Sequence, residues 1–140
     1  MAELTAFLPI TKDELAQLAR DRKHDFELLR SQGQWTTSVY IGGYIAEARL
    51  KYKICERLDV DHLPAIFKTH HLLALIIFAG LSKPLNTLPK VERNLRKIHR
   101  IHVDAAWRYK CFSPLHQRDS DRLNNWLFHP NDGVITWLGL

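Results

Sequence analysis

Glu47 and Lys51 are the first residues in this sequence whose types and spacing could do chemistry. They lie four positions apart with the acid first, and this spacing brings the two side chains together on an α-helix. The surrounding stretch, residues 40–51, is otherwise mostly apolar or small, so we expect the pair to be buried. Such a pair could exchange protons with a ligand or hold packed helices in register. The second interpretation is favoured.

Basic residues are concentrated in a second region, between Lys83 and Lys110. The net charge of the whole chain is +5, and the residues outside this region are together close to neutral. One flank of an expected helix there carries Arg93, Arg96, Lys97 and Arg100, opposite the apolar stripe Val91, Leu95, Ile98, His102 and Ala105. This flank could follow a phosphate backbone. A solvated face without a ligand is an equally good interpretation.

Histidines occur in two close pairs that could also do chemistry. His99 and His102 have the spacing of metal ligands on a helix, but no Cys or carboxylate is placed to complete a site, so we expect neither a metal ion nor another cofactor. His70 and His71 fall in the first turn of an expected helix, where capping or packing is favoured over catalysis.

The elements that must position these residues are all expected to be helices. A capping box from Thr11 to Glu14 begins a first helix that ends near Gly33, and a second, central helix follows at 34–58. Gly42 and Gly43 indicate that a neighbour approaches this second helix closely, either within the chain or across a dimer contact. The next expected helix, 72–79, is capped by Thr69, ended by Gly80 and fully buried. A further helix at 89–110 begins at Pro89. The last two are expected at 119–128 and, as a short segment, at 134–138.

Segments 59–67 and 82–88 are expected to be loops, and no alternating strand pattern is present. The predicted fold is all-α, an antiparallel up-and-down bundle of four main helices with short C-terminal helical segments.

Composition limits the class of protein. A chain of 140 residues with 46% hydrophobic and 25% charged residues is consistent with one domain spanning 1–140. Cys55 and Cys111 lack metal-type spacing and are expected to be reduced thiols, as in a cytoplasmic protein. The longest apolar run, residues 72–81, is about half of a membrane span, and residues 1–10 lack the pattern of a signal peptide. We therefore expect neither membrane insertion nor secretion.

Four blocks of residues, in this order, resemble the stand-alone HEPN domains of prokaryotes. These are Tyr40, Gly43, Tyr44, Glu47, Leu50 and Lys51; then Thr69, His70, His71 and Leu72 with Ala79, Gly80 and Leu81; then Arg108 and Tyr109; and finally Gly133, Val134, Trp137 and Leu138. The resemblance covers most of the chain. It implies a helical bundle that commonly forms homodimers and that works with nucleotidyltransferase partners, in toxin–antitoxin pairs or in defence systems.

In its active branch, the resemblance implies a metal-independent endoribonuclease. Such enzymes use an arginine and a histidine separated by four to six residues, often with a polar residue after the arginine. Arg93 and Asn94 with His99 fit this pattern best, and Arg96 with His102 is the alternative. Arg93 would hold phosphate and His99 would move protons, while RNA would also be bound by Asn94, Arg96, Lys97, Arg100 and Arg108.

Arginine and histidine suit the chemistry of RNA cleavage, but their positions on one helix limit how they can form a site. RNA cleavage needs a group that moves the 2′-hydroxyl proton near neutral pH and a cation that stabilises charge on the phosphate. On an ideal helix, however, Arg93 and His99 point roughly 120° apart. A site built from them therefore needs a helix end, a distortion or a second protomer.

The alternative function is a non-catalytic module. The same bundle could bind a nucleotidyltransferase, an antitoxin or another protein through an apolar face, or hold a nucleotide without cleaving it. Arg108 and Tyr109 could contribute to a nucleotide cleft, although anchoring of the C-terminal segment is the favoured role for them.

Overall fold

The computed structural model describes residues 9–104 and 115–140, and all of their regular elements are helical. The longer helices are α1 (Lys12–Ser31), α2 (Trp35–Leu58), α5 (Pro89–Val103) and α7 (Gln117–Phe128). The shorter ones are the 3-10 helix η2 (Ala65–Phe67), α3 (Leu72–Phe78), α4 (Ser82–Asn86) and α8 (Val134–Leu138). The all-α prediction is confirmed for this part of the chain. Within the same residues, no helix combines the length and the apolar character needed to cross a lipid bilayer.

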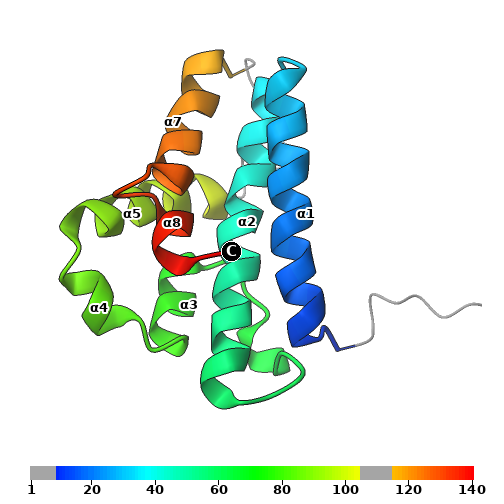
Figure 1. The fold of residues 1–140 in the computed structure, drawn as a ribbon, viewed down its shortest axis with the longest axis vertical. Coiled ribbons are helices and arrows are strands. Elements are labelled where there is room, and N and C mark those ends of the chain that lie inside the picture. Colours follow the sequence, from blue (N-terminus) through cyan, green and yellow to red (C-terminus); the bar gives the residue numbers. More distant parts are fainter. Residues whose placement is uncertain (1–8, 105–114) are drawn as a thin grey trace, which may run out of the picture.

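Local sequence signals explain the long pair formed by α1 and α2. Thr11 Oγ1 accepts a hydrogen bond of 3.0 Å from the Glu14 backbone amide, and Glu14 Oε1 accepts one of 3.2 Å from the Thr11 amide, so the predicted capping box is present. Gly33, at φ +69°, allows the sharp turn that follows α1. The two helices run side by side in opposite directions (Figure 1).

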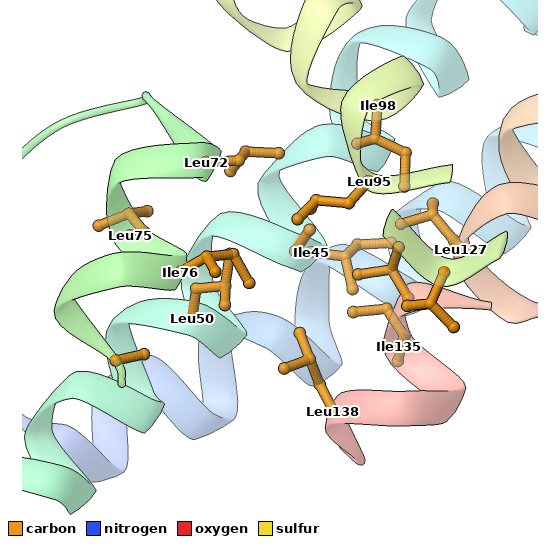
Figure 2. Packing of buried hydrophobic residues seen from close by; sticks show 14 of the residues in the cluster. Ile45, Leu50, Leu72, Leu75, Ile76, Leu95, Ile98, Leu127, Ile135 and Leu138 are labelled. Carbon is orange, nitrogen blue, oxygen red and sulfur yellow. The ribbon is translucent and has the colours of Figure 1, made fainter. Parts of the chain in front are cut away.

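Helix α2 is central, as predicted, and contacts α1, α3, α5, α7 and α8. Figure 2 shows side chains from α2, α3, α5, α7 and α8 meeting in one apolar core. Representative members are Ile45 and Leu50 from α2, Leu72, Leu75 and Ile76 from α3, Leu95 and Ile98 from α5, Leu127 from α7, and Ile135 and Leu138 from α8. Burial of this apolar surface holds the shorter helices against α2.

Several predictions for the middle of the chain were wrong. Part of the expected loop 82–88 is the helix α4, because Leu85 is buried in the core and helical turns satisfy its backbone. Helix α3 is capped by His71, whose Nδ1 accepts from the Ala74 amide at 3.1 Å, and Thr69 instead accepts from the His71 amide. The same helix is not buried throughout, since Ile77 is 63% exposed.

Helix α5 ends at Val103, earlier than expected, with Asp104 in an extended conformation. The remainder of the expected helix lies outside the described residues, together with Ala105, Arg108, Tyr109 and Cys111. Gly80 follows α3 at φ +73°, which confirms its predicted left-handed conformation.

The two glycines of α2 are sites of close helix crossing within the chain. A Cβ atom at Gly42 would lie 3.2 Å from Leu123 Cγ of α7 and 3.2 Å from a ring carbon of Phe26 of α1. A Cβ atom at Gly43 would overlap the ring of His102 of α5, 2.7 Å from its Cγ. The glycines therefore admit α7 and the His102 side chain.

Gly43→Ala is expected to destabilise the fold by about 1–3 kcal/mol, because the added methyl group must displace the His102 ring. Urea unfolding followed by circular dichroism measures this loss. In a His102→Ala background the same methyl group should cost much less, since the obstructing ring is gone. An equal loss in both backgrounds would contradict the crossing described here.

Candidate functional site

The carboxylate of Glu47 is the centre of a buried polar cluster. Its Oε1 lies 2.6 Å from His70 Nδ1 and 2.9 Å from His102 Nε2, and its Oε2 lies 3.1 Å from Lys51 Nζ. The predicted pairing of Glu47 with Lys51 is confirmed, and within the described part of the chain it is one of three polar contacts of this carboxylate. We call Glu47, Lys51, His70 and His102 the Glu47 cluster.

Three segments bring this cluster together. Glu47 and Lys51 lie one turn apart on α2, His102 lies in the last turn of α5, and His70 belongs to the segment just before α3. The side chains of Glu47 and His102 are only 9% and 3% exposed, whereas that of His70 is 50% exposed. The cluster therefore has a fixed interior and one side chain that reaches the surface.

Electrostatics keep Glu47 ionised. Burial by itself raises the pKa of Glu47, but the hydrogen bond with His102, the charge of Lys51 and the hydrogen bond with His70 together outweigh it, and the pKa falls from 4.5 to about 2. An ionised carboxylate is only an acceptor, so both ring nitrogens that face it donate. This fixes a proton on His70 Nδ1 and on His102 Nε2.

Tyr44 packs against both histidines of the cluster. Its ring is edge-on to His102 at a centroid distance of 4.6 Å and to His70 at 5.9 Å, and the ring of Tyr40 lies 5.7 Å from it. Most of the α2 residues on which the HEPN resemblance rests thus belong to the Glu47 cluster or pack against it. Thr69 lies beside it and hydrogen-bonds the His71 amide.

A second pair of histidines lies next to this cluster. His99 of α5 makes an edge-on ring contact with His71, with their ring centroids 4.4 Å apart and their planes at 61°. Burial, and then the charges of His71, His102 and Arg96, lower the pKa of His99, so its imidazole is neutral at pH 7. Its Nδ1 is buried and has no hydrogen-bond partner among the described residues.

The structure does not bring Arg93 and His99 together. Helix α5 is continuous from Pro89 to Val103, so neither a helix end nor a distortion closes the angle of roughly 120° between them. Arg93 is exposed, and Asn94 is turned to the other side, where its amide donates to the Asp132 carbonyl oxygen at 3.0 Å. The alternative pair, Arg96 with His102, is also separated, because His102 points inward to Glu47.

The basic flank of α5 is exposed. Arg93, Arg96, Lys97 and Arg100 are all solvent-accessible. Arg96 pairs with Glu92 at 3.0 Å, and Lys97 Nζ lies 5.5 Å from the ring centroid of Trp126. These are surface contacts that a polyanion could replace.

An open cavity of about 770 Å³ adjoins the Glu47 cluster, because Glu47, Lys51 and His70 are among its lining residues. It is bounded by α1, α2 and the segment 62–70. Its polar lining includes Glu14, Tyr44, Glu47, Lys51, His62, Lys68, Thr69 and His70. A small polar ligand could therefore reach Glu47 and His70 directly.

Sequence reasoning missed that His70 and His102 share Glu47. We expected no carboxylate close to His102, and this expectation was wrong. Glu47 is distant from His102 in the sequence, but α2 brings its carboxylate into contact with the His102 ring. One signal was available: His102 falls on the apolar stripe of α5, and a buried imidazole needs a polar partner.

No family model, curated protein or solved structure matches this chain.

Acid is expected to destabilise the wild-type protein through Glu47. A carboxyl group whose pKa is depressed in the folded state stabilises the fold above its unfolded pKa, and this stabilisation is lost as the pH falls from about 4.5 to about 2. Between pH 5 and pH 2, the free energy of unfolding of the wild type should fall by about 3 kcal/mol more than that of Glu47→Gln.

Urea unfolding at several pH values measures this difference, with Glu27→Gln on the exposed side of α1 as the control that should behave like the wild type. If the wild type and Glu47→Gln lost stability in parallel, Glu47 would not be the buried anion described here.

Proposed function

We propose that this protein is an RNA-directed helical bundle of the HEPN type that cleaves RNA without a metal ion, with His99 as the residue that moves the proton. The observation that carries this proposal is the position of His99. It is a half-buried, neutral imidazole, and it lies beside an exposed basic flank on the same helix. A general base for RNA cleavage needs this combination of protonation state and nearby cations.

The basic flank supports RNA as the class of ligand. Arg93, Arg96, Lys97 and Arg100 project within an arc of roughly 100° around α5, away from the core. Four cations along one helix side can each neutralise a phosphate and release its counterions. Binding of this kind follows the backbone and carries no preference for base sequence.

Arg96 is the better partner for His99 within one chain. It precedes His99 by three positions, so the two side chains project about 60° apart, and its charge already acts on the His99 imidazole. Arg93 is then a contact to the RNA backbone. In a homodimer, which the HEPN resemblance implies, Arg93 of a second copy could also approach His99.

The reaction follows from these roles. Neutral His99 takes the proton of a ribose 2′-hydroxyl, and the 2′-oxygen attacks the adjacent phosphorus as the bond to the 5′-oxygen breaks. Water supplies the proton to the leaving 5′-oxygen, and Arg96 stabilises the charge that develops on the phosphate. The products are a 2′,3′-cyclic phosphate and a 5′-hydroxyl end.

The cavity beside Glu47 favours a second candidate, a non-catalytic binding module. Lys51, Lys68 and His70 line a space of about 770 Å³, which is large enough for a nucleotide. In this alternative the protein would hold a nucleotide, or a partner such as a nucleotidyltransferase or an antitoxin, and the α5 flank would not be a site of reaction.

Cleavage of end-labelled single-stranded RNA in excess chelator tests the first candidate. The wild type should cut the RNA and leave cyclic phosphate ends, and His99→Ala should lower the rate by about 100-fold or more while RNA affinity changes little. Arg96→Ala should weaken both binding and cleavage, because that cation acts in both steps.

The matched controls are His24→Ala and Arg20→Ala, both exposed on α1, which should cleave at the wild-type rate. Wild-type cleavage by His99→Ala would reject this site. Nucleotide binding without RNA cleavage by the wild type would favour the module instead.

A further inference from the structure

The Glu47 cluster contains a donor set that goes beyond the proposed RNA chemistry. One ligand atom from each of Glu47, His70 and His102 lies within 4.8 Å of the others. Two imidazoles and one carboxylate are a common protein ligand set for zinc in sites that keep a fourth position open. We propose that Glu47, His70 and His102 bind a divalent transition-metal ion of the zinc class.

The carboxylate ligand already has the charge state that a metal ion requires, and it faces both imidazoles. Glu47 is an anion, and Oε1 is the one oxygen that both imidazoles face, at 2.6 Å from His70 Nδ1 and 2.9 Å from His102 Nε2. In a tetrahedral zinc site, ligand atoms lie about 3.3 Å apart. Each imidazole nitrogen therefore needs to move away from Glu47 Oε1 by less than about 1 Å, and the proton that it donates to the carboxylate must leave it when the ion binds.

Two of the ligands are held rigidly, and the third can move. His102 is fixed between α2 and α5, because Gly43 leaves only enough room for its ring. Glu47 is buried on α2 and is held by its ion pair with Lys51. His70 is half exposed and lies in the segment before α3, so its side chain can turn to complete the site.

The cavity gives the metal ion a route in and an open coordination position. Glu47 and His70 line the cavity of about 770 Å³, so an ion between them would face solvent on that side. Water or an oxygen or nitrogen atom of a small ligand would be the fourth ligand.

Lys51 allows a test of the proposed metal site, because its positive charge should repel a bound metal ion. Its Nζ binds the other carboxylate oxygen, Oε2, at 3.1 Å, so Oε1 remains available, but its positive charge lies beside the site. Repulsion between two cations at this range weakens binding. Removing the Lys51 charge should therefore tighten metal binding, whereas removal of a ligand should weaken it.

The experiment is calorimetric titration of the chelator-treated full chain with Zn²⁺, and absorption spectroscopy with Co²⁺ to report the coordination. The wild type should bind one ion, with the intense visible absorption of four-coordinate Co²⁺. His70→Ala and Glu47→Gln should weaken binding at least tenfold, and Lys51→Gln should tighten it several-fold. His24→Ala, on the exposed side of α1, should bind like the wild type.

Circular dichroism and thermal melting check that each variant is folded, and His70→Ala is the safest variant because its side chain is half exposed. The proposal is overturned if the wild type binds no ion, or if His70→Ala binds as tightly as His24→Ala. Since the titration contains no RNA and RNA cleavage is assayed in chelator, each proposal can fail without the other.

Discussion

One buried carboxylate links α2 to α5 and to the segment that precedes α3. Glu47 accepts hydrogen bonds from His70, before α3, from His102, on α5, and from Lys51, on its own helix. A buried carboxylate with fewer partners would be strongly destabilising, so each donor constrains the position of its own segment. The apolar core supplies most of the driving force for folding. The Glu47 cluster adds directional hydrogen bonds, which would break if a helix shifted along its axis.

Helix α5 separates the two kinds of chemistry proposed for this protein. His102 points inward to Glu47, the flank from Arg93 to Arg100 points outward, and His99 lies between them against His71. The same regular helix therefore presents a buried ligand, a neutral base and a set of exposed cations on different sides. In the proposals made above, RNA would bind on one side of α5, and a small ligand or metal ion would reach Glu47 from the cavity.

Features governed by neighbouring residues could be predicted from the sequence. The capping box at Thr11, the left-handed Gly80 and the pairing of Glu47 with Lys51 each depend on residues no more than four positions apart. The partners of Glu47 could not be predicted in this way, because His70 lies 23 positions away and His102 lies 55 positions away. Their contact depends on how α2, α3 and α5 pack, and the helical pattern of any one segment does not contain that information.

The most direct measurement of the central claim is the coupling free energy between Glu47 and His102. Urea unfolding at pH 7 of the wild type, Glu47→Gln, His102→Ala and the double variant yields this quantity, with Glu27→Gln and His102→Ala as a distant pair that should be additive. A hydrogen bond to a buried charge predicts a coupling of about 1.5–3 kcal/mol. Additivity within about 0.5 kcal/mol would contradict the account, because the two side chains would then contribute independently.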